Sequence, residues 1–163
     1  MGLNTAVANA GTGLRASVML HLPALVMDGN IGWALKRAGQ MGLQIKGYWG
    51  EGDNSLGDMY QISNPLSVGA GEKEILATVQ KGAVDLMEYE RKARAEMIAA
   101  RRMELEDRVC RALGILEHCR IVASKEAIDL LGSVRLGLSL GVLSNPSLEV
   151  VTALMILSQK AHI

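Results

Sequence analysis

Residues 9–22 read NAGTGLRASVMLHL, and the second part of this stretch alternates between two kinds of side chain. From Leu14 onward every second residue is apolar, and the positions between carry Arg15, Ser17, Met19 and His21. A period of two is typical of a β-strand with one buried face and one partly polar face. The residues in front of this strand fit either a tight turn or a pocket for a phosphate.

A phosphate pocket here would combine Gly11, Thr12 and Gly13 with Arg15. Glycine lets backbone N–H groups approach an anion closely, and arginine adds a fixed positive fork. The spacing does not fit the GxxxxGK[ST] pattern, and a strand follows where that motif requires a helix. Spacing alone therefore favours a simple turn. His21 falls on the same side of the predicted strand as Arg15, so it could face a ligand, and a packed or solvated histidine fits equally well.

The chain has 163 residues, enough for one domain with a sizeable core, and we predict a single domain over residues 1–163. Lysine plus arginine equals aspartate plus glutamate at 17 each, which argues against nucleic acid or an anionic membrane as a partner. Two cysteines make no disulfide framework, so we expect a reduced, cytoplasmic protein. Cys110, His118 and Cys119 match no zinc spacing, and no protein metal site is expected.

Further elements follow from periodicity. Alternation predicts strands at 43–49 and 59–64, and helical spacing begins at Ile31. One long helix or two consecutive ones are expected from Glu72 to about Leu113, followed by helices after Ser124 and Ser147 joined by a turn-rich connector. Strands come first and helices afterwards, which predicts an α+β fold. We expect a partial antiparallel sheet of three or more strands in residues 1–64, flanked by helices in residues 72–163.

Two segments carry charges that could serve binding. In KGYWGEGDNSLGD, residues 46–58, Glu51 lies among glycines and Lys46 precedes it. A carboxylate on a mobile loop suits a guanidinium ligand, although an ordinary surface loop explains the segment as well. Residues 88–108 mix acids and bases, with Glu90 and Arg94 four residues apart, and a solvated helix face is the favoured interpretation.

Four longer stretches resemble the ATP:guanido phosphotransferases, the phosphagen kinase family, and most of all its bacterial protein-arginine kinase branch. They are NAGTGLRASVMLHLPAL, GYWGEGDNSLGDMYQISN, ELEDRVCRALGIL and SKEAIDLLGSVRLGLSLGVL, in the family's order. The resemblance implies the C-terminal half of the family's catalytic domain, an antiparallel sheet flanked by helices. It also implies ATP or ADP with magnesium as cofactors.

The resemblance assigns roles to individual residues. The turn with Asn9, Gly11, Thr12 and Gly13, together with Arg15, corresponds to the family's nucleotide-phosphate site. Lys46 stands where a second phosphate-binding arginine is expected, and Glu51 matches the carboxylate that binds the guanidinium. Ala6 replaces the family's reactive cysteine, and Lys46 lacks the bidentate fork of an arginine.

These departures shape the expected function. We predict a truncated or degenerate guanido-kinase-like module, a pseudokinase, that binds phosphoarginine or an adenine nucleotide. One alternative is protein-arginine kinase activity when a missing N-terminal half completes the chain. The other is a structural or oligomerisation module. The expected partners are a small phosphorylated ligand or a protein's arginine side chain, and a second copy or a complementing chain.

Overall fold

A three-stranded antiparallel sheet lies at the centre of the part of the chain that the structure describes, which is residues 14–48, 55–65 and 71–158 of a computed structural model. The strands are β1 (Ser17–His21), β2 (Gln44–Gly47) and β3 (Met59–Ser63), in the order β1-β3-β2. Ser17 lies opposite Ser63 in the first pair, and Gln44 lies opposite the same Ser63 in the second. The predicted α+β class with an antiparallel sheet is therefore confirmed.

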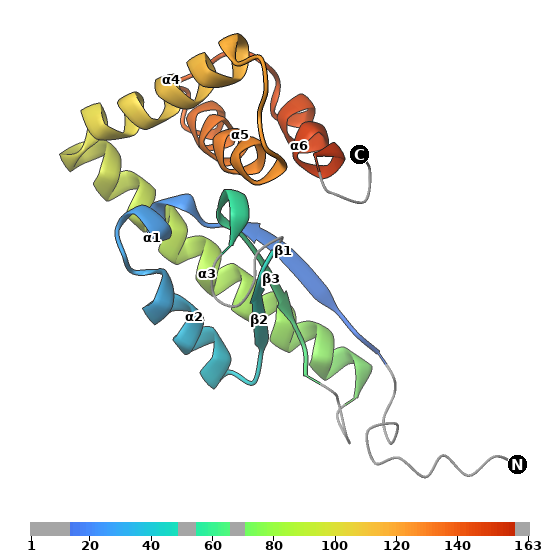
Figure 1. Ribbon diagram of the computed structural model, residues 1–163. Coiled ribbons are helices and arrows are strands. Elements are labelled where there is room, and N and C mark those ends of the chain that lie inside the picture. The colour runs from blue at the N-terminus through green and yellow to red at the C-terminus, as the bar shows by residue number, and fades with distance from the viewer. Residues whose placement is uncertain (1–13, 49–54, 66–70, 159–163) are drawn as a thin grey trace, which may run out of the picture.

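Helices account for most of the remaining described chain. They are α1 (Pro23–Met27), α2 (Ile31–Gln40), α3 (Glu72–Ala100), α4 (Arg102–His118), α5 (Ser124–Ser139) and α6 (Leu148–Leu157), with a one-turn 3-10 helix, η2 (Leu56–Asp58), directly before β3. Figure 1 shows α3 running along one face of the sheet, while α4, α5 and α6 gather beyond one end of it. No helix in the described ranges is long and apolar enough to cross a membrane.

The long helix α3 packs on the sheet because its buried positions recur at helical spacing. Ile75, Val79, Leu86, Ala93 and Met97 are all at most 5% exposed. All of them except Ile75 meet the apolar face of the sheet, including Leu20 and Ile62, in one continuous core. Removing apolar area from water, worth about 25 cal/mol per Å², holds these two layers together.

A second apolar cluster joins the three C-terminal helices. Ala112 of α4, Ile128 and Leu131 of α5, and Val151 and Met155 of α6 are all buried in it. Leu56 of η2 and Met59, the first residue of β3, pack against the same cluster. The C-terminal helices therefore cover one end of the sheet, and among the described residues the face opposite α3 is otherwise mostly exposed.

Most helix and strand boundaries predicted from the sequence lie within a few residues of those in the structure. Two predictions differ from the structure. The stretch after Pro23 was expected only to break the strand, but it forms α1. Residues 135–145 were expected to form a connector, whereas α5 continues to Ser139. That helix persists because Val134 and Leu136 are buried against neighbouring elements, so tertiary packing outweighs the local glycines. Ser147 caps α6 as predicted, accepting a hydrogen bond from Val150 N.

Candidate functional site

The face of the sheet opposite α3 carries two exposed cations. Lys46 on β2 lies opposite Gln61, and Gln61 lies opposite Met19 on β1, so the three side chains share one face. Exposure alternates along β1 back to Arg15, which is exposed on the same side as Met19. The register therefore brings Arg15 and Lys46, far apart in sequence, to a common surface.

Neither of these cations has a carboxylate partner within the described residues. Arg15 precedes Met19 by four residues, and β2 lies two strands from β1. With a rise of about 3.4 Å per residue and a strand spacing of about 4.8 Å, their Cα atoms are roughly 16 Å apart. Both side chains are long, so both cations can reach a ligand that lies between them on this face.

An asparagine holds the strand segment that carries Arg15. The Asn64 side-chain amide donates to Leu14 O at 3.0 Å, and its side-chain oxygen accepts from Ala16 N at 2.8 Å. Asn64 is buried, and its backbone N–H donates to Ala16 O at 3.2 Å. Arg15 is thus flanked on both sides by residues fixed to the end of β3, which orients its side chain onto the open face.

His21 lies on the same side of β1, but the structure buries it. Its register partner is Met59, at the end of the sheet that the C-terminal helices cover. The side chain is about 9% exposed, and neither ring nitrogen has a hydrogen-bond partner in the described part of the chain. Burial lowers the pKa of His21 well below 6.5, and the positive charges of Arg135, Arg94 and Arg108 lower it further.

The remaining predicted site residues lie outside the described ranges. They are Ala6, Asn9, Gly11, Thr12, Gly13 and Glu51. Their roles stay predictions. Within the described ranges, no group of three or more histidine, cysteine, aspartate or glutamate side chains could hold a metal ion.

The sequence did not predict a set of buried charges beside the site. Glu90 of α3 is 4% exposed and accepts hydrogen bonds from Ala24 N and Leu25 N, both at 3.1 Å, at the start of α1. Arg94 pairs with it at 2.6 Å, which confirms the predicted contact but places it inside rather than on a solvated face. A signal existed, because Glu90 falls on the same helical stripe as Leu86 and Met97.

A second ion pair, between buried Asp58 and half-buried Arg108, joins η2 to α4. Asp58 accepts a hydrogen bond from Arg108 Nη2 at 2.9 Å, and Arg108 Nε donates to Ser133 Oγ at 3.0 Å. Burial raises the pKa of Asp58 to about 6, although the Arg108 guanidinium acts in the opposite direction. Burial likewise raises the pKa of Glu90. Because each of these charged groups is paired or hydrogen-bonded, they link the elements that surround the open face.

Comparisons with known proteins show the family of the chain. The model of the ATP:guanido phosphotransferase C-terminal catalytic domain matches residues 2–93, more than half of the chain. The chain belongs to this family. A second model, the protein-arginine kinase McsB C-terminal domain, matches residues 102–163. The resemblance inferred from the motifs is confirmed.

Individual relatives carry the name protein-arginine kinase. That of Halalkalibacterium halodurans is 46% identical over 157 residues, which is 96% of this chain and 44% of the relative. That of Bacillus subtilis strain 168 is 43% identical over 157 residues, 96% of this chain and 43% of the relative. The chain therefore spans a little over two fifths of the length of these curated relatives.

Proposed function

We propose that this chain binds a phosphate-bearing ligand, an adenine nucleotide or phosphoarginine, on the open face of its sheet. The observation that carries the proposal is the pairing of Arg15 and Lys46 on one exposed face without carboxylate partners in the described residues. Guanidinium and ammonium groups form strong charge-assisted hydrogen bonds to phosphate oxygens. ADP and ATP offer several anionic groups to these two cations, and phosphoarginine offers one phosphate.

A second candidate is ATP-dependent phosphoryl transfer to a protein's arginine, performed together with a complementing chain. It is supported by relatives named protein-arginine kinase that match nearly all of this chain. Arg15 and Lys46 would neutralise the phosphates and Glu51 would hold the guanidinium, while bound magnesium would neutralise charge on the transferred phosphoryl group. Ala6, in place of the family's cysteine, makes transfer by this chain alone the weaker proposal.

The sheet itself offers a place for a complementing chain or a second copy. In the described residues β1 and β2 form its two edges, each with only β3 as a neighbour. An edge strand presents unpaired backbone N–H and C=O groups to which another strand can add. Self-association or complementation is therefore part of the proposal.

The binding proposal is tested by isothermal titration and thermal melting of the chain with ADP, ATP and phosphoarginine. Arg15→Ala and Lys46→Ala should each weaken binding by about ten- to a hundredfold, the loss expected for one charge-assisted hydrogen-bond set. Lys46→Arg should tighten binding, because the guanidinium adds a second parallel donor. Melting temperature should rise with ligand concentration only where binding persists.

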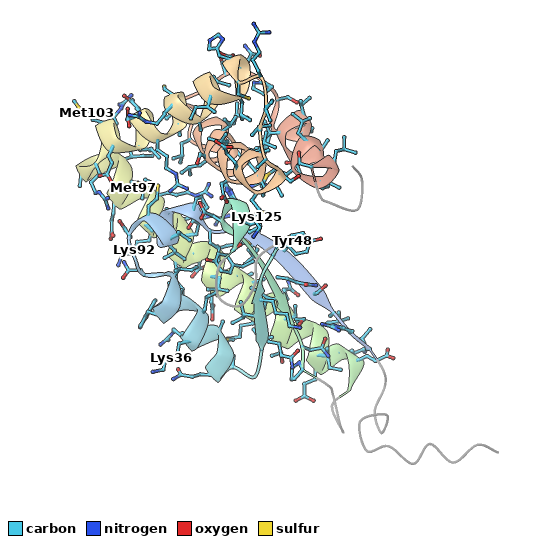
Figure 2. All side chains as sticks on the ribbon, viewed as in Figure 1. Lys36, Tyr48, Lys92, Met97, Met103 and Lys125 are labelled. Atoms are coloured by element: carbon cyan, nitrogen blue, oxygen red, sulfur yellow. The ribbon has the colours of Figure 1, made fainter. Side chains whose placement is uncertain are left out.

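Matched controls remove a cation elsewhere on the surface. Arg91→Ala on α3 and Lys36→Ala on α2 change the net charge equally, and Figure 2 shows Lys36 on α2, away from the sheet face. Both should bind as the wild type does. Wild-type protein that shows no binding to any of the three ligands at millimolar concentration contradicts the proposal. If the purified chain formed phosphoarginine from ATP, phosphoryl transfer would replace ligand binding as the proposed function.

A further inference from the structure

Side chains of α4 and α5 hold the one-turn helix η2 in place. Gly57 N donates to Asp129 Oδ1 of α5 at 2.7 Å, and the next residue, Asp58, accepts from Arg108 of α4 at 2.9 Å. Two consecutive residues of η2 are thereby tied to two different helices. In Figure 1 η2 lies directly against α5.

The contact is close enough to leave no room for a side chain. A Cβ added at Gly132 of α5 would lie 2.7 Å from the Cα and the carbonyl oxygen of Gly57. Gly57 and Asp58 both have positive φ, 62° and 56°, and an aspartate in this left-handed region is uncommon. Such a backbone conformation persists when contacts with neighbouring elements hold it in place, and here α4 and α5 make those contacts.

The same turn fixes the end of β2. Leu56 N donates to Tyr48 O at 3.2 Å, and Tyr48 N donates to Met59 O at 2.7 Å. Tyr48 directly follows β2, two residues after Lys46, and Figure 2 shows it at the end of the sheet beside η2. Asp58 O also accepts from Leu22 N at 2.9 Å, at the end of β1. Displacement of η2 would therefore move the end of the strand that presents Lys46.

This connection crosses the boundary between the two family matches. Lys46, Tyr48 and Gly57 lie in the segment that matches the catalytic-domain model, whereas Arg108 and Asp129 lie in the segment that matches the C-terminal-domain model. We propose that Asp129 and Arg108 are positioning residues, through which helices α4 and α5 set the placement of β2 and the phosphate affinity of the sheet face. The affinity part rests on the proposed function; the placement of β2 does not.

The experiment compares Asp129→Ala with Asp129→Asn in the full chain. Alanine removes the acceptor for Gly57 N, whereas the asparagine oxygen still accepts that hydrogen bond. In Asp129→Ala, amide exchange measured by NMR should accelerate about tenfold or more at Tyr48 and Leu56, while the amide of Leu86 in α3 stays as protected as in the wild type. ADP affinity by titration should fall by about three- to tenfold, as expected for a displaced cation. Asp129→Asn should stay within about twofold of the wild type in both measurements.

Glu126→Ala is the matched control, because it removes an exposed acid from the same helix. It should change neither measurement. Unaltered exchange at Tyr48 in Asp129→Ala overturns the proposal, as does equal acceleration at Leu86, which would mean global destabilisation. Accelerated exchange with unchanged ADP affinity also overturns it. If the wild type binds phosphoarginine but not ADP, the affinity is measured with phosphoarginine instead. If the wild type binds none of the three ligands, the proposed function fails, and the exchange measurements alone decide whether the helices place β2.

Discussion

Two buried groups at the covered end of the sheet respond to pH in opposite senses. The pKa of Asp58 is raised to about 6 and that of His21 is lowered well below 6.5, in each case mainly by burial. Relative to the unfolded chain, the folded chain holds the Asp58 proton more tightly and the His21 proton less tightly. Stability therefore depends on both groups in the weakly acidic range.

We expect His21→Leu to flatten the acid side of the stability profile. The contribution of His21 is complete above pH 6.5 and is lost as the pH falls below it, by at most about 1.4 kcal/mol per pH unit. Leucine has no proton to gain, and no hydrogen bond of the ring is lost within the described residues. Urea unfolding at pH 7.5 and 5.5 measures the effect. The wild type should lose about 1 kcal/mol more than the variant between these values.

We expect Asp58→Asn to change the pH dependence of stability in the opposite sense to His21→Leu. The Asp58 carboxyl stabilises the fold below pH 3.8, and this contribution is lost as the pH rises through about 6. The wild type should therefore lose more stability than Asp58→Asn between pH 4 and pH 6.5. Asparagine also tolerates the left-handed conformation at this position. If stability depended on pH in the same way in the wild type and in both variants, the shifted pKa values of Asp58 and His21 would be contradicted.

At the scale of elements, the approach of η2 to α5 depends on paired glycines. Gly132 is buried in the middle of α5, where alanine would otherwise favour the helix by about 1 kcal/mol. The added methyl group would meet the backbone of Gly57 at 2.7 Å, and backbone cannot move aside as a flexible side chain can. Overpacking should therefore outweigh helix propensity at this position.

Gly132→Ala should destabilise the protein by about 1–3 kcal/mol, the range found for overpacked cores. Gly114→Ala in α4 is the control, since nothing lies within 4 Å of a Cβ there. That variant should be neutral or more stable, by up to about 1 kcal/mol. Urea denaturation of the two variants provides the measurement. If both substitutions changed the stability equally and in the same direction, helix propensity and not packing would determine the effect of Gly132→Ala.

At the scale of the molecule, the helical part and the sheet share one core. Leu105 and Val109 of α4 and Leu136 of α5 are fully buried in the same cluster as Leu20 and Ile62 of the sheet. The buried charges add to this continuity, because Arg94 donates to Ser139 Oγ of α5 at 2.9 Å. Elements that share buried residues unfold together. We therefore propose that the described parts act as one domain.

Leu136→Ala should lower the stability of both parts together, by about 2–5 kcal/mol. The two tryptophans, at positions 33 and 49, report by fluorescence on the N-terminal half, while far-UV circular dichroism reports mainly on the helices. The two signals should keep a common midpoint in the wild type and in the variant. Leu157→Ala, at an exposed position of α6, should change stability by less than about 0.5 kcal/mol. Separate midpoints would contradict the shared core.

The sequence by itself determined the family and most of the elements, but not α1 or the end of α5. The alternation from Leu14 predicted β1 and the exposed side of Arg15, because a period of two depends only on local backbone geometry. The helical spacing from Glu72 predicted α3, and the ordered motifs predicted the family that the comparisons show. The periodicities depend only on neighbouring residues, and the family is indicated by motifs that follow one another in the sequence.

Only the tertiary structure decided which residues meet. The strand order β1-β3-β2 brings Lys46 to the face of Arg15, and no local pattern specifies that pairing. The acidic side chains of Glu90 and Asp58 belong to a charged helix and a glycine-rich loop, whose composition predicted solvated surfaces. They are buried because α1 and α4 supply the N–H groups and the guanidinium that satisfy them, and such partners become available only when distant segments pack together.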